Sequence, residues 1–69
     1  MEKIVAITTP TGTVGVKIKD IESIYKDTEG IISIQTVNST LHDVIEINGN
    51  HCDSVEDVVS EINDTIEGY

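Results

Sequence analysis

The side chains best suited to chemistry lie around the single cysteine of this chain. His51, Cys52 and Asp53 are consecutive, and His42 lies upstream. Three adjacent side chains converge poorly on one metal ion, and the spaced cysteine and histidine pairs of zinc sites do not occur in the sequence. If a helix follows, Cys52 lies beside its N-terminus, where a thiol pKa is often lowered. Because no histidine is clearly placed to act as a base, the sequence predicts no catalytic residue, no metal site and no cofactor.

Carboxylates are the second group of candidates for chemistry. They occur close together along the chain, as Asp20 with Glu22, Asp27 with Glu29, and Asp43 with Glu46. None of these pairs lies in a pattern typical of a catalytic acid with its base. The turn over residues 27–30 is too short for a calcium-binding loop. Weak binding of a divalent cation remains an alternative.

Charge is divided unevenly between the two parts of the chain. Residues 1–26 hold all four lysines and three acids, which gives +1, whereas residues 27–69 hold ten acids and no lysine or arginine, which gives −10 and a net charge of −9. Nucleic-acid backbones and anionic membranes repel such a chain, so we expect neither as a partner. A basic protein is a compatible partner, although excess carboxylates also serve solubility alone.

Length and composition limit the class of protein. Sixty-nine residues predict a single small domain over 1–69, with an aliphatic core because the aromatic residues are two tyrosines. One cysteine excludes an internal disulfide. No apolar run approaches the roughly 20 residues that cross a bilayer, and the first residues lack the apolar stretch of a signal peptide. We therefore expect a cytoplasmic protein.

A hairpin is predicted at the start of the chain. Residues 3–9 and 13–18 alternate as strands, and residues 9–13 form a loop around Pro10 and Gly12. If Thr9 faces Thr13, one face carries Ile4, Ala6, Val14, Val16 and Ile18. The other face then carries Lys3, Val5, Ile7, Gly15, Lys17 and Lys19. We expect this second face to stay uncovered in a monomer and to form a contact surface.

Further strands are predicted in the middle of the chain. The spacing of Ile18, Ile21 and Ile24 predicts a short helical turn that leads into a strand, and a turn over 27–30 precedes a strand over 31–37. The last strand, over 40–47, has an ambiguous register. A two-residue loop places Asp43 opposite Ile34, whereas a three-residue loop moves His42, Val44 and Glu46 to that face. A bulge near Asp43 would reconcile the two, and Asn48, Gly49 and Asn50 end the strand.

A C-terminal helix over residues 54–66 completes the prediction. Val55, Val58, Val59, Ile62 and Ile66 form one apolar stripe. Asp53 with Glu56, or Ser54 with Asp57, supplies the N-terminal cap, and Gly68 is the expected stop. The outer face carries Glu56, Asp57, Glu61, Asp64 and Glu67. The expected fold is therefore α+β, with four or five mostly antiparallel strands over residues 3–47 and one amphipathic helix.

Residues 16–62 resemble the small flagellar FlbD-like proteins. The matching stretches are 21–24 after a glycine-containing hairpin, 31–34, and 53–59 at the start of the terminal helix. The resemblance implies a compact sheet closed by one helix, and it implies no catalytic residues. This sequence departs from the family pattern between His42 and Cys52, where the family passes almost directly from strand to helix, and its hairpin lacks the usual Asn-Gly.

These observations favour a small non-enzymatic protein-interaction module that self-associates as a dimer or larger oligomer. Its expected contact residues are Lys3, Val5, Ile7, Lys17 and Lys19. One alternative is an acidic inhibitor or decoy of the phage or mobile-element type, which would bind a basic host protein through the acids of the helix. Another is an oligomeric sponge for a small molecule, with the hairpin lysines as anion contacts.

Overall fold

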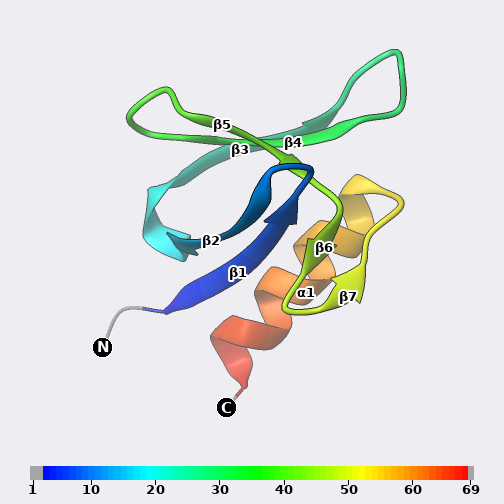
Figure 1. Ribbon diagram of the computed structural model, residues 1–69. Coiled ribbons are helices and arrows are strands. Elements are labelled where there is room, and N and C mark those ends of the chain that lie inside the picture. The colour runs from blue at the N-terminus through cyan, green and yellow to red at the C-terminus, as the bar shows by residue number, and fades with distance from the viewer. Residues whose placement is uncertain (1–2, 69) are drawn as a thin grey trace.

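The computed structural model describes residues 3–68 and shows two antiparallel sheets with a C-terminal helix (Figure 1). One sheet has the strand order β2-β1-β6-β7, formed by Gly12–Lys17, Ile4–Thr9, Glu46–Ile47 and Asn50–His51. The other has the order β3-β4-β5, formed by Ile21–Lys26, Ile32–Thr36 and Leu41–Val44. The 3-10 helix η1 spans Ile18–Asp20, and α1 spans Val55–Glu67. The predicted α+β class is confirmed, but the described residues form seven strands in two sheets.

The β1–β2 hairpin has a shorter loop than predicted. Thr9 pairs with Gly12, so the loop is formed by Pro10 and Thr11, and Gly12 adopts a φ of 142°. The hydroxyl of Thr9 accepts a hydrogen bond from the Thr11 N–H at 3.2 Å and donates one to the Gly12 carbonyl at 2.9 Å. Shortening a hairpin loop by one residue changes which side chains of the two strands share a face.

The new register changes which residues of β1 share a face with Val14 and Val16. Val5 pairs with Val16 and Ile7 pairs with Val14, so these four aliphatic residues share one face. Val5 and Ile7 are fully buried, with 0% of either side chain exposed, whereas Ile4 is 55% exposed. The expectation that the face of Val5 and Ile7 stays uncovered is therefore wrong, because this register places them in the core.

The strand predicted over residues 40–47 is divided at Ile45. A loop of three residues, 37–39, precedes it, and Ile34 pairs with His42 while Ile32 pairs with Val44, as in the second register considered. Ile45 then leaves the three-stranded sheet. Its N–H donates to the Thr8 carbonyl at 2.8 Å, and its carbonyl accepts from the Cys52 N–H at 3.1 Å. This bend connects β5 in one sheet to β6 in the other.

A further hairpin joins β6 to β7. Asn48 and Gly49 have φ values of 53° and 84°, which suit a tight two-residue turn that closes on Ile47 and Asn50. Asn48 also holds the turn in place: its side-chain oxygen accepts from the Ala6 N–H at 3.0 Å, and its side-chain nitrogen donates to the Thr65 hydroxyl at 2.9 Å. The sequence predicted only that these residues end a strand, and the hairpin was not predicted.

The helix begins and ends where the sequence predicted, within one residue. Ser54 is the N-cap and accepts from the Asp57 N–H at 3.1 Å, while the Asp57 carboxylate accepts from the Asp53 N–H at 2.9 Å. Val58 and Ile62 of the predicted stripe are buried. Within residues 3–68, no helix has the length and apolar character needed to cross a membrane.

Two lysines of the basic part hold the two ends of α1. The Lys3 ammonium donates to the carbonyls of Thr65 and Ile66 at 3.1 and 2.9 Å. The Lys26 ammonium donates to the Asp53 carbonyl at 3.0 Å, just before the helix. The last turn of α1 contains no basic residue of its own, so Lys3 supplies the positive charge that a helix C-terminus favours.

Candidate functional site

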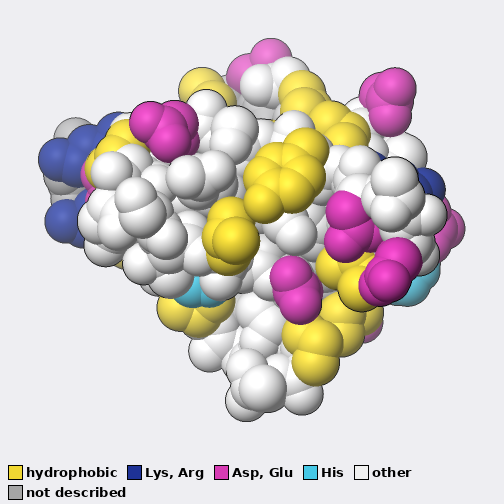
Figure 2. Space-filling model, turned by 90° about the horizontal axis from the view of Figure 1, so that it is seen from above, with side chains coloured by type: hydrophobic (Ala, Val, Ile, Leu, Met, Phe, Trp, Pro, Cys, Tyr) yellow, Lys and Arg dark blue, Asp and Glu magenta, His cyan; other side chains and the backbone are white. Residues whose placement is uncertain are grey.

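The predicted basic contact surface is not assembled as a unit. Val5 and Ile7 lie in the core, and Lys3 is bonded to the end of α1. Lys17 and Lys19 are exposed, at the end of β2 and in η1. In Figure 2, the largest group of lysine side chains lies at the left edge of the face shown, whereas acidic side chains gather on the right. Lys3 and Lys26 lie instead at the two ends of the acidic helix α1, so the lysines do not form one basic face.

The five acids predicted on the outer face of α1 divide into two groups. Asp57 caps the helix, and the Glu61 carboxylate accepts from the Asn50 side-chain amide at 3.1 Å, so both face the β7 side. Glu56, Asp64 and Glu67 are exposed, and their carboxylates make no hydrogen bond or ion pair within residues 3–68. These three carboxylates are available to a partner.

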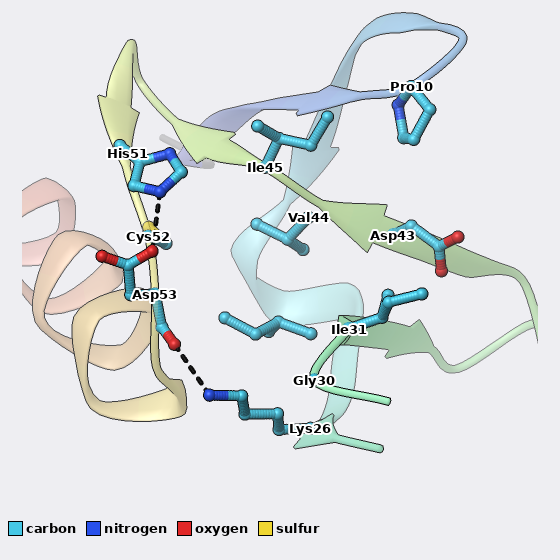
Figure 3. A pocket seen from close by; sticks show the side chains of 11 residues that line it. Pro10, Lys26, Gly30, Ile31, Asp43, Val44, Ile45, His51, Cys52 and Asp53 are labelled. Carbon is cyan, nitrogen blue, oxygen red and sulfur yellow. Dashed lines mark hydrogen bonds and ion pairs between the residues drawn. The ribbon is translucent and has the colours of Figure 1, made fainter. Parts of the chain in front are cut away.

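A cleft of about 500 Å³ lies between the two sheets and the start of α1 (Figure 3). Its apolar wall consists of three buried residues and two partly exposed ones. The buried residues are Ile32, Val44 and Cys52, and the partly exposed residues are Ile31 and Ile45. Its polar rim carries Lys26, Asp43, His51 and Asp53.

The polar groups on one side of this cleft already have partners. His51 Nε2 lies 2.7 Å from Asp53 Oδ1, and the Lys26 ammonium is bonded to the Asp53 carbonyl. The side chains of His51 and Asp53 are 63% and 80% exposed, so water screens this contact. The cleft thus offers an aliphatic wall and a hydrogen-bonding rim to a small amphipathic group.

Cys52 lies in the wall of the cleft as a core residue. Burial raises the pKa of its thiol, the negative charges of Glu61, Asp57 and Asp53 raise it further, and a hydrogen bond with the backbone of Ile47 lowers it in part. The expectation of a lowered thiol pKa is therefore wrong, because removal from water outweighs any effect of the nearby helix N-terminus. Among the described residues, no three His, Cys, Asp or Glu side chains are grouped to hold a metal ion.

One of the smaller hollows, of about 210 Å³, lies between α1 and the segment formed by η1 and β3. We call it the β3–α1 groove, and its lining residues are Ile18, Ile21, Ile24, Val59, Ile62 and Asn63. Val59 is 40% exposed, whereas the isoleucines of η1 and β3 are half-buried. One edge of β3 pairs with β4, and no strand of residues 3–68 pairs with its other edge. The groove is therefore aliphatic and borders an unpaired strand.

The sequence predicted the elements that line this groove but not the groove itself. The spacing of Ile18, Ile21 and Ile24 predicted η1 and β3 correctly, and Val59 was placed on the apolar stripe of the helix. The sequence did not predict that η1 and β3 lie beside α1. Comparison with protein-family models, with curated proteins and with solved structures finds no match for the chain. The resemblance to FlbD-like proteins therefore stays a prediction.

Proposed function

We propose that this chain is a small non-enzymatic protein-interaction module that self-associates through the β3–α1 groove. The proposal is carried by one observation: the row of aliphatic side chains in this groove, with Val59 exposed, lies beside an edge of β3 that no strand of residues 3–68 pairs with. Water contact with such a row is unfavourable, and an open strand edge presents unpaired backbone groups. A second copy that covers the aliphatic row and the strand edge removes both unfavourable contributions to the free energy.

The size of the groove favours a protein partner over a small molecule. Its volume of about 210 Å³ lies below the roughly 300–1,000 Å³ that is typical of small-molecule pockets. One or two aliphatic side chains from another copy would fill such a space. The exposed Val59, at the rim of the same groove, is a side chain of suitable type.

Self-association is tested by light scattering and sedimentation over low to high micromolar protein concentrations. We expect a concentration-dependent dimer that Val59→Glu abolishes, because a carboxylate cannot be desolvated in an aliphatic contact without a large cost. Val37→Glu is the matched control, since Val37 is 59% exposed and lies in the loop between β4 and β5. A wild-type chain that stays monomeric at high micromolar concentration would contradict the proposal, and far-UV circular dichroism verifies that both variants fold.

An acidic inhibitor or decoy of a basic host protein is the second candidate. It is favoured by the three exposed carboxylates of Glu56, Asp64 and Glu67, which lack partners within residues 3–68. The test compares capture of basic proteins from host lysate by the wild-type chain and by a variant with these residues changed to Gln. Equal capture by both chains would exclude the helix as the binding surface.

A small-molecule sponge is the third candidate, and it is favoured by the volume of the cleft. At about 500 Å³ the cleft falls within the usual range for small-molecule pockets, although its rim, with Asp43 and Asp53, is a poor match for the anions that the sequence suggested. Calorimetric titration with nucleotides that shows no heat of binding would dismiss nucleotides as its ligands.

A further inference from the structure

The cleft of Figure 3 joins an aliphatic wall to a rim whose charges do not cancel. Three charged side chains line it: Lys26 is positive, whereas Asp43 and Asp53 are negative. With His51 counted as neutral, the lining therefore carries a net charge of −1 at pH 7. A ligand with one positive charge complements this lining, and the net charge of −9 on the whole chain attracts cations toward it.

The two carboxylates of the rim differ in how far their charge is compensated. Asp53 Oδ1 lies 2.7 Å from His51 Nε2, and the Lys26 ammonium donates to the Asp53 carbonyl at 3.0 Å. Asp43 Oδ1 accepts one long hydrogen bond, from the Ser33 hydroxyl at 3.4 Å, and Asp43 forms no ion pair with the described part of the chain. Asp43 is therefore the carboxylate of the rim that can receive a cation without displacing a charged partner.

The aliphatic wall begins beside Asp43. Figure 3 shows Ile31, Val44 and Ile45 between Asp43 on one side of the cleft and Cys52 on the other. Ile31 and Ile45 are 42% and 38% exposed, so part of this wall is in contact with water. An alkyl chain that starts at Asp43 covers these side chains, and the removal of apolar surface from water is favourable.

The far end of the cleft disfavours an anionic ligand. Burial raises the pKa of the Cys52 thiol, and the negative charges of Glu61, Asp57 and Asp53 raise it further. The same charges act on any group that is bound beside Cys52, and they oppose a carboxylate or a phosphate there. An amine is therefore favoured over an acid of the same length at either end of the cleft.

We propose that the cleft binds a primary aliphatic amine, whose ammonium group pairs with the Asp43 carboxylate and whose alkyl chain lies on the aliphatic wall. The ammonium contact is a charge-assisted hydrogen bond, and the chain supplies the apolar contact. The proposal rests on the third candidate function, for which it names the ligand class, and not on self-association through the β3–α1 groove. Free alkylamines and the lysine side chains of a basic partner share this chemistry.

Three ligands of one chain length test the preference for an amine. Hexylamine, hexanol and hexanoate are titrated separately into the isotope-labelled chain, and the methyl signals of Ile31, Val44 and Ile45 are followed by NMR. We expect hexylamine to bind roughly tenfold or more tightly than hexanoate, with hexanol between them. Butylamine should bind roughly tenfold more weakly than hexylamine, because it lacks two methylene groups that the wall covers. Equal affinities for all three ligands would keep the cleft as a small-molecule site but overturn the amine.

Neutralising Asp43 tests the position of the ammonium group. Asp43→Asn keeps the shape of an exposed side chain and removes its charge, so we expect hexylamine to bind roughly fivefold more weakly. Asp64→Asn is the matched control, because it makes the same charge change at an exposed position of α1 outside the cleft. If the two variants weaken binding equally, the amine responds only to the net charge of the chain and the proposed site is wrong.

A lysine derivative distinguishes the two sources of the amine. Nα-acetyl-lysine methylamide carries the same four-carbon chain and ammonium group as butylamine, but it is attached to a peptide backbone. Binding of butylamine alone assigns a free amine, whereas binding of the derivative assigns a lysine side chain of a partner, and binding of neither overturns the proposal. The Val59→Glu chain separates the two sites, since we expect it to bind hexylamine as the wild type does even though it no longer dimerises. A wild-type chain that stays monomeric and still binds hexylamine would contradict self-association and support the amine site.

Discussion

The cleft of Figure 3 and the β3–α1 groove both border the aliphatic core, and they differ in how far their polar and aliphatic groups are already covered. The cleft is larger, but polar groups on its rim are bonded to one another and most of its aliphatic wall is buried. The groove is smaller, but Val59 is exposed in it, and no strand of residues 3–68 pairs with the edge of β3 beside it. The volume of a hollow therefore says less about a contact surface than the groups that the hollow leaves without partners.

The largest effect is expected from the core that the two hollows share. Ile7→Ala should lower the free energy of unfolding by about 2–5 kcal/mol, because Ile7 is fully buried and its truncation leaves a cavity. Ile4→Ala, on the opposite face of β1, should cost well under half of that. Urea denaturation of both variants provides the measurement. A larger loss for Ile4→Ala would instead support the register predicted from the sequence, in which Ile4 and not Ile7 shares a face with Val14 and Val16.

A smaller effect is expected from the two lysines that hold α1. Lys3→Met removes the bonds to the last carbonyls of the helix, near one end of the groove, and should cost about 0.5–1 kcal/mol of stability. Lys26→Met removes one bond at the rim of the cleft and should cost less. Thermal unfolding at low and high salt measures both. A larger loss for Lys26→Met would show that the bond before the N-terminus of α1 stabilises the helix more than the bonds at its C-terminus.

The smallest effect is expected from the thiol in the wall of the cleft. The pKa of Cys52 is raised above its ordinary value of 9.0, chiefly by burial, so the unfolded chain loses this proton at a lower pH than the folded chain. The contribution is present below about pH 9 and is lost as the pH rises through the folded-state pKa. We expect the stability difference between wild type and Cys52→Ala to shrink between pH 8 and pH 10.5 in urea denaturation. A difference that is constant across this range would mean that the thiol is open to solvent in the cleft.

The helix was predictable because its signals are local. Two of these signals, the spacing of Val58 and Ile62 and the Ser54 cap, agree with the structure. The turn at Gly30 also depends only on neighbouring residues, and the structure shows it as well. The hairpin loop was less certain, because Pro10 and Gly12 fit a loop of two or three residues equally well. Choosing between them requires knowing which face of β1 the rest of the chain covers.

The remaining differences have non-local causes. The bend at Ile45 depends on a hydrogen bond to Thr8, and the Asn48–Gly49 hairpin is flanked by strands of two residues each, too short to show alternation. The groove could not be predicted for the same reason, since it forms only when η1 and β3 lie beside α1. Sequence patterns report the periodicity of single elements and not which elements become neighbours.

By itself, the sequence determined the α+β class, the helix and its cap, and the separation of positive from negative charge, because composition and short-range spacing suffice for these. The tertiary structure decided how that charge is used. It placed Lys3 and Lys26 on backbone carbonyls at the two ends of α1, buried Val5 and Ile7, and left Val59 partly exposed in an aliphatic groove. The physical reason is that burial and hydrogen bonding depend on contacts between segments distant in the chain, and these form only when the sheets and the helix pack together.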